Sequence, residues 1–135
     1  MRLADKRSNM ELRYDRVIHP GSSPEHWALS LHGFFGRRED WREVAQQTVA
    51  KRPDWGIALV DLRLHGESTR FDPPHTVQAC VEDVRRLMAL NFGTSAEALI
   101  GHSFGGKVAL GLAQEAAASL RQGPTLPDPA GIAGR

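Results

Sequence analysis

Gly101-His102-Ser103-Phe104-Gly105 is the segment whose residue types and spacing are best suited to chemistry. It follows the apolar run Ala98-Leu99-Ile100 and precedes a helical pattern, which is the context in which a serine acts as a nucleophile. Such a turn strains the serine backbone, and bulky side chains two residues before or after it would collide. Gly101 and Gly105 meet that requirement. The segment therefore predicts covalent catalysis by the Ser103 hydroxyl group.

Two further loops follow predicted strands earlier in the chain. Trp27 to Leu31 is a continuous apolar run that ends in the loop 32–36, with the sequence His-Gly-Phe-Phe-Gly. Gly56 to Asp61 is a second apolar run, and it opens into the loop 62–68. In a parallel sheet, functional residues collect at the carboxyl ends of the strands. We therefore expect these two loops to meet Ser103 at one edge of the sheet.

Helical patterns separate the predicted strands. Asp40 is expected to cap one helix that stops at Pro53, and Thr76 a second that stops at Gly93. A third helix is predicted over residues 104–120. Strands that alternate with amphipathic helices indicate an α/β fold, with a mostly parallel sheet and helices on both of its faces.

The remaining segments complete the predicted organisation. Met10 to Ile18 alternates apolar and charged residues, as an edge strand does, whereas Ala98-Leu99-Ile100 is predicted to be a buried strand. Cys80 falls on the apolar face of the second helix and is expected in the core. We expect one domain over residues 1–121 and a tail, rich in Gly and Pro, over residues 122–135.

Composition excludes several classes of partner. Lys and Arg number 17 against 16 Asp and Glu, so the net charge of +1 favours neither nucleic acid nor an anionic membrane. A single cysteine favours a reducing compartment, and no apolar run reaches membrane-spanning length. We expect a soluble intracellular protein, cytoplasmic, with a plastid location left open. Neither a metal nor an organic cofactor is expected, because an activated serine supplies the covalent step.

The three loops together resemble the α/β-hydrolase superfamily, in particular its AB hydrolase-1 type of serine hydrolases and esterases. The resemblance rests on His32-Gly33, on the run Asp-x-Arg-x-His-Gly-x-Ser over residues 61–68, and on residues 101–108. The resemblance covers residues 27–120, and it is strongest to plant, algal and cyanobacterial members. It implies the three-layer α/β-hydrolase fold, truncated after the helix that follows the nucleophile.

The resemblance also implies roles for individual residues. Ser103 would be the nucleophile, and the backbone N–H groups of Phe34 and Phe104 would form the oxyanion hole. His32 and His65 would hold the site loops together, and the side chain of His102 would point away from the nucleophile. The implied substrate is a small molecule with an acyl group, either an ester, a thioester or an amide.

A phosphate-binding loop is the main competing interpretation. The run from Gly101 to Lys107 fits most of that motif, which also lies between a strand and a helix. Val108, however, occupies the position at which that loop needs Ser or Thr to bind magnesium, and the strand that ends in Asp61 precedes the loop. Nucleotide binding is therefore disfavoured.

The catalytic partners of a serine nucleophile are missing from this sequence. In the family the acid and the histidine follow the serine, but no histidine follows Ser103, and Asp128 is the single acid beyond the third helix. We therefore expect the N-terminal half of a hydrolase. Two alternatives stay open, a non-catalytic binding module and a half-domain that another chain completes. An incomplete sheet would also favour self-association through its exposed edge.

Overall fold

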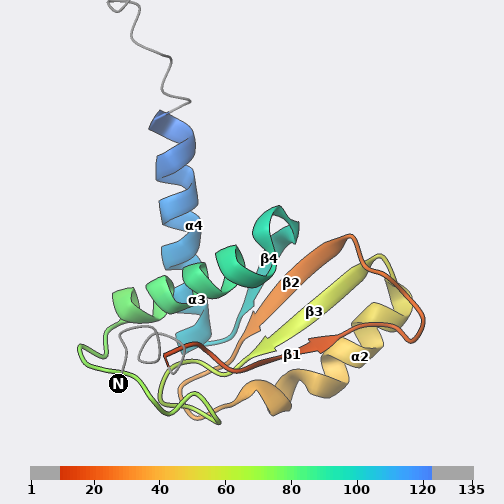
Figure 1. Ribbon diagram of the computed structural model, residues 1–135, viewed down its shortest axis with the longest axis horizontal. Coiled ribbons are helices and arrows are strands. Elements are labelled where there is room, and N and C mark those ends of the chain that lie inside the picture. Colours follow the sequence, from red (N-terminus) through yellow and green to blue (C-terminus); the bar gives the residue numbers. More distant parts are fainter. Residues whose placement is uncertain (1–9, 123–135) are drawn as a thin grey trace, which may run out of the picture.

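A four-stranded sheet in the order β1-β3-β2-β4 organises the computed structural model, which describes residues 10–122 (Figure 1). The strands are β1 (Tyr14–Val17), β2 (His26–Leu31), β3 (Trp55–Val60) and β4 (Ala96–Gly101). The helices are α2 (Arg42–Lys51), α3 (Val77–Asn91) and α4 (Phe104–Gln122), with short 3-10 turns η1 (Arg38–Trp41) and η2 (Gly93–Ser95). β2 pairs in parallel with β3 and β4, whereas β1 is antiparallel to β3. The predicted α/β class with a mostly parallel sheet is confirmed.

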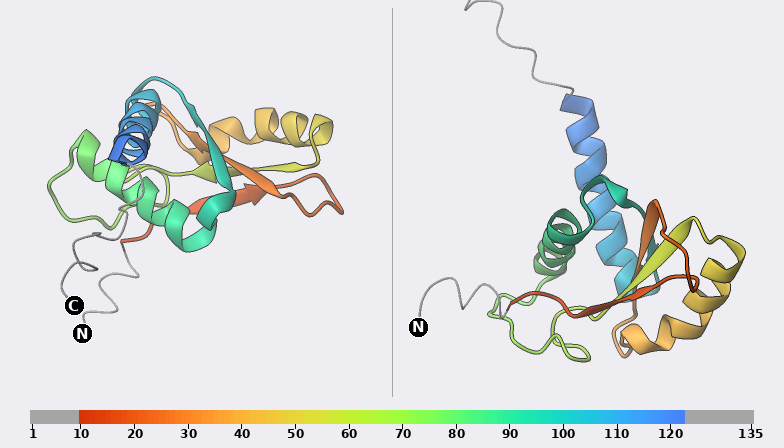
Figure 2. Two further views of the ribbon diagram at one scale, coloured as in Figure 1. Left: turned by 90° about the horizontal axis from the view of Figure 1, so that it is seen from above. Right: turned by 45° about the vertical axis from the view of Figure 1, so that its right-hand side comes forward.

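Alternating side chains of the central strands feed two separate cores. Trp27, Leu29 and Leu31 of β2 pack with α3 and α4 on one face of the sheet, and Ala28 packs with α2 on the other. Figure 2 shows α2 and α3 on opposite sides of the sheet. This is the three-layer arrangement predicted from the sequence, and it arises because β2 is buried on both faces.

The second predicted helix is confirmed in detail. The hydroxyl group of Thr76 accepts a hydrogen bond from the Ala79 N–H at 3.1 Å and caps α3, as its sequence position predicts. Cys80 is buried on the inner face of α3, and burial raises the pKa of its thiol. It is therefore a core residue.

The predicted start of the first helix was wrong. Asp40 lies inside the turn η1, where its carboxylate accepts the Arg37 N–H at 3.1 Å, and α2 begins at Arg42. Ala45 and Val49 of α2 are buried, whereas the apolar Val44 is exposed. The carboxylate of Asp40 therefore stabilises the start of η1 and does not cap α2.

The prediction that Ala98-Leu99-Ile100 is a buried strand was also wrong. β4 lies at one edge of the sheet, and none of its residues is buried. α4 extends two residues past its predicted end, and its second half projects away from the sheet, where Leu120 is 82% exposed (Figure 1). β4 is exposed because the strand order leaves one of its sides without a neighbour among the described residues.

The remaining predictions concern the ends of the chain and the membrane. The tail predicted from residue 122, with Asp128, lies outside the described residues apart from Gln122, which ends α4. None of the helices within residues 10–122 combines the length and the apolar character needed to cross a membrane.

Candidate active site

Ser103 occupies a strained turn between the end of β4 and the start of α4. Its φ angle is 53°, in the left-handed region, which costs about 1–3 kcal/mol for a residue other than glycine. The turn is closed by hydrogen bonds from Gly105 N–H to His102 O and from Gly106 N–H to Ser103 O, both at 2.9 Å. The hydroxyl group is consequently carried on an exposed corner at the carboxyl end of the sheet.

Gly101 and Gly105 allow the chain to pack tightly around this turn. A Cβ atom on Gly101 would lie 2.6 Å from Gly105 O, and one on Gly105 would lie 2.0 Å from Leu31 O. Both obstacles are backbone atoms, which cannot rotate away as a side chain can. The spacing of small residues that singled out Ser103 in the sequence thus has a direct steric cause.

The loop after β2 passes directly beside Ser103. A Cβ atom on Gly33 would lie 3.5 Å from the Ser103 Cβ, so the peptide that carries the Phe34 N–H begins next to the serine. The aromatic rings of Phe34 and Phe104 meet edge to face, with their centroids 5.9 Å apart. Within residues 10–122, no hydrogen bond engages the backbone N–H of either residue. Both N–H groups therefore remain available as hydrogen-bond donors.

His32 fixes the orientation of the peptide between Gly33 and Phe34. Its Nδ1–H donates to Gly33 O at 2.7 Å, and its Nε2 accepts from the Leu62 N–H at 3.0 Å. Because the C=O and N–H of a trans peptide point in opposite directions, holding Gly33 O also sets the direction of the Phe34 N–H. Both nitrogens of His32 are thus used within the protein, and its side chain is 1% exposed.

The burial of His32 makes stability depend on pH. Burial lowers its pKa below the ordinary value of 6.5, more than the hydrogen bond to Gly33 O raises it, and the nearby His65 lowers it further. Unfolded His32 therefore binds a proton in a pH range where folded His32 stays neutral. Its contribution to stability is complete above about pH 6.5 and is lost progressively as the pH falls toward the folded pKa.

We therefore expect the free energy of unfolding to decrease between about pH 7.5 and about pH 5.5, and to decrease less in His32→Gln. Urea unfolding at the two pH values measures both slopes, so groups common to the two proteins cancel. Equal slopes in the two proteins would show that His32 is not the group responsible.

His65 joins the loop after β3 to the loop after β2. Its Nδ1 lies 2.8 Å from Arg63 O, and its Nε2 makes a short contact with Phe34 O. A neutral ring can donate to one of these carbonyl oxygens, and a protonated ring can donate to both. Neither His32 nor His65 therefore has a ring nitrogen that is free of protein contacts.

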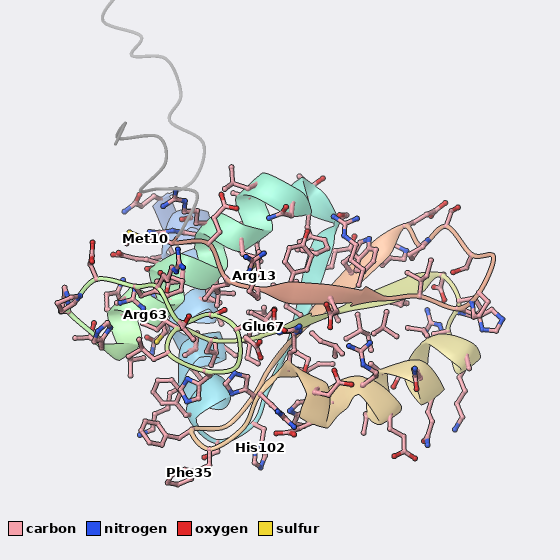
Figure 3. All side chains as sticks on the ribbon, turned by 60° about the horizontal axis from the view of Figure 1, so that its bottom comes forward. Met10, Arg13, Phe35, Arg63, Glu67 and His102 are labelled. Atoms are coloured by element: carbon pink, nitrogen blue, oxygen red, sulfur yellow. The ribbon has the colours of Figure 1, made fainter. Side chains whose placement is uncertain are left out.

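A hollow of about 550 Å³ opens beside Ser103 and includes residues that the sequence did not point to. His102 lies on its wall, with its ring centroid 5.9 Å from that of Trp41. Phe35 is 99% exposed at its rim, and Figure 3 shows it pointing outward on the same side of the molecule as His102. The remaining lining is largely apolar and includes Phe34 and Val44.

A metal site has no support within residues 10–122. In that part of the chain, His, Cys, Asp and Glu side chains do not gather in groups of three or more that could hold an ion.

Comparison with known proteins was made against families, curated proteins and solved structures. A sequence model of the "Alpha/beta hydrolase family" matches residues 28–134. The chain is 34% identical over 108 residues to a "2-succinyl-6-hydroxy-2,4-cyclohexadiene-1-carboxylate synthase" of Klebsiella pneumoniae, a match that covers 78% of this chain and 39% of the relative. It is 36% identical over 104 residues to a "sn-1-specific diacylglycerol lipase ABHD11" of Xenopus tropicalis, a match that covers 77% of this chain and 31% of the relative.

Among solved structures, an esterase of a marine microorganism superposes with a TM-score of 0.67 at 25% identity, covering 80% of this chain and 38% of that one. The chain therefore spans between about a third and two fifths of the length of the relatives it matches.

Proposed function

Because the chain belongs to the alpha/beta hydrolase family, we propose that it carries the nucleophile of a serine hydrolase that cleaves a carboxylic ester, thioester or amide through an acyl-enzyme. The single observation that carries this proposal is the left-handed backbone of Ser103 at the turn between β4 and α4. Residues other than glycine that are held in such a strained conformation cluster at active sites.

In the proposed reaction, Ser103 Oγ attacks the carbonyl carbon and gives its proton to a base. Negative charge then develops on the carbonyl oxygen, where the N–H groups of Phe34 and Phe104 would stabilise it, each by roughly 3 kcal/mol. The positive end of α4 adds to this field. The bond to the leaving group breaks, the alcohol, thiol or amine takes the proton, and water hydrolyses the acyl-enzyme.

The substrate class is proposed from the hollow beside Ser103. Its lining is largely aromatic, with the carboxyl group of Asp40 as its one acid, and therefore favours an apolar acyl group over an anionic one. The names of the relatives, a lipase and a synthase, differ too much to select one substrate. We propose a small molecule that has an uncharged apolar acyl group.

We propose that the base for Ser103 is supplied from outside the residues described. Within them, the ring nitrogens of His32 and His65 are already engaged by the site loops. We propose that further polypeptide provides the histidine and the acid, since the relatives are longer than this chain. Among the described residues, one edge of β4 has no strand beside it, which favours a second candidate, a non-catalytic module that binds a partner.

One experiment distinguishes these functions. Lysate of the source cells is treated with an alkyl fluorophosphonate, which an activated serine attacks with loss of fluoride, and the tryptic peptide Leu87 to Lys107 is analysed by mass spectrometry. Heat-denatured lysate is the control. We expect Ser103 to be modified in a protein heavier than 14.9 kDa.

The other outcomes have distinct meanings. Modification in a protein of 14.9 kDa would place the base within this chain or in a partner chain that completes the domain. Recovery of the unmodified peptide alone, from lysate in which other serine hydrolases are labelled, would overturn the catalytic role of Ser103 and favour the binding module.

A further inference from the structure

Asp61, directly after β3, has a buried carboxyl group to which two separate loops are hydrogen-bonded. Its side chain is 1% exposed. Oδ1 accepts the backbone N–H of Arg38 at 2.7 Å, and Oδ2 accepts the backbone N–H of Glu67 at 3.0 Å. The guanidinium group of Arg38 also pairs with Oδ2. A buried carboxyl group needs such partners, and here they come from both loops that flank the serine.

The backbone of Asp61 is itself held firmly. Its N–H donates to Arg13 O at 2.9 Å, and its carbonyl oxygen accepts from the Ser68 hydroxyl group at 2.7 Å. The same hydroxyl oxygen accepts the Arg13 N–H at 2.9 Å. The carboxyl group therefore projects from a fixed point at the edge of the sheet. Figure 3 shows Arg13 and Glu67 close to one another.

Two routes lead from this carboxyl group to Phe34. The first runs through Arg38, which lies four residues after Phe34 in the same loop. The second runs through the neighbouring loop, where Glu67 binds Asp61 and His65 contacts Phe34 O. Asp61 therefore restrains the loop of Phe34 from both sides.

Gly66 shows how closely the second loop packs on Asp61. Its φ angle is +51°, and a Cβ atom there would lie 2.2 Å from Asp61 Oδ2. The loop thus combines a conformation that suits glycine with a contact that leaves no room for a side chain. Such packing defines the position of the Glu67 N–H, and through it the position of His65.

We propose that Asp61 is a positioning residue, whose carboxyl group holds the loop 33–38 so that the Phe34 N–H is in place for the oxyanion formed at Ser103. This inference rests on the function proposed above. A shift of about 1 Å in a group that stabilises a transition state can cost up to about a hundredfold in rate. Asp61 makes no contact with substrate in this scheme and acts through Arg38 and His65.

The test uses the chain carrying Ser103→Cys, because a thiolate attacks without a base. Two rates are measured on the introduced thiol, acylation by p-nitrophenyl acetate and alkylation by iodoacetamide. Acylation passes through an oxyanion and alkylation does not. We expect Asp61→Asn to lower the ratio of acylation to alkylation about tenfold, with the alkylation rate unchanged. A purely structural role would leave this ratio unchanged.

Asp15→Asn is the matched control. It removes another carboxylate from the same guanidinium group, 2.9 Å from Arg38 Nε, and leaves the Arg38 N–H bond to Asp61 in place. The ratio is expected to stay at the parent value. If Asp61→Asn does not fold by circular dichroism, Arg38→Lys takes its place, and a smaller decrease in the ratio is expected.

Each remaining outcome has one meaning. A high ratio in the parent that Asp61→Asn, or Arg38→Lys in its place, leaves unchanged would overturn the positioning role and leave the proposed function standing. An equal decrease in Asp15→Asn would assign the effect to the guanidinium group instead. A parent ratio no higher than that of N-acetylcysteine would overturn the oxyanion hole, and the role of Asp61 with it.

Discussion

Ser103→Cys is expected to be acylated by p-nitrophenyl acetate about a hundredfold faster than N-acetylcysteine at equal thiolate concentration. The serine hydroxyl needs a base, whereas an ordinary cysteine thiol, with a pKa of about 8.5, is largely ionised at about pH 9. The thiolate attacks the carbonyl carbon, p-nitrophenolate leaves, and a thioester remains on the protein. The rate then reports the two N–H donors and the positive end of α4, with no contribution from a base.

The release of p-nitrophenol should stop at one equivalent per chain. Hydrolysis of the thioester needs an activated water, and neither His32 nor His65 has a free ring nitrogen to activate it. Ser103→Ala measures the background from Cys80, which is buried and has a raised pKa. Sustained turnover would show that this chain contains its own base, and would contradict the proposal that further polypeptide provides it.

Gly105→Ala is expected to destabilise the fold by about 3 kcal/mol or more. The new methyl group would lie 2.0 Å from Leu31 O and 2.6 Å from His32 O, both at the end of β2. Neither carbonyl can move freely, because β2 is the strand that pairs with both β3 and β4. Relief would require α4 to separate from the sheet. Thermal and urea unfolding followed by circular dichroism measure the loss.

Gly106→Ala is the matched control at the next position. The nearest atom to its added Cβ would be Gly101 O at 3.6 Å, an ordinary contact. Alanine in a helix is favoured over glycine by about 1 kcal/mol, so this variant should be neutral or slightly more stable. Similar losses in the two variants would mean that the close packing of Gly105 on β2 does not occur in solution.

Local patterns in the sequence were sufficient for several elements. The apolar runs predicted β2 and β3, and Thr76 predicted the start of α3, because each depends on residues close in the chain. Asp40 was wrongly predicted to cap α2. An acid that is followed three residues later by a glutamate, here Glu43, is equally compatible with a 3-10 turn before the helix. Hydrophobic spacing alone also placed Val44 in the core, where the structure leaves it exposed.

The exposure of β4 could not be inferred from its own residues. An apolar strand is buried only if other strands lie on both sides of it, and the order β1-β3-β2-β4 is decided by pairing between distant segments. The same holds for Asp61, whose sequence position suggested a turn residue. Its contact with Arg38 joins residues 23 positions apart and exists only because two loops meet above the sheet.

The sequence by itself determined the strand-to-helix turn that carries Ser103, because a serine between two glycines is a local pattern with a local steric cause. It also determined the α/β class through the alternation of apolar runs and amphipathic segments. Only the tertiary structure decided that Phe34 lies beside Ser103, that His32 and His65 are engaged by carbonyl and N–H groups of the loops, and that Asp61 restrains both loops. These contacts join residues far apart in the chain, and their positions follow from strand order and packing, which no local pattern encodes.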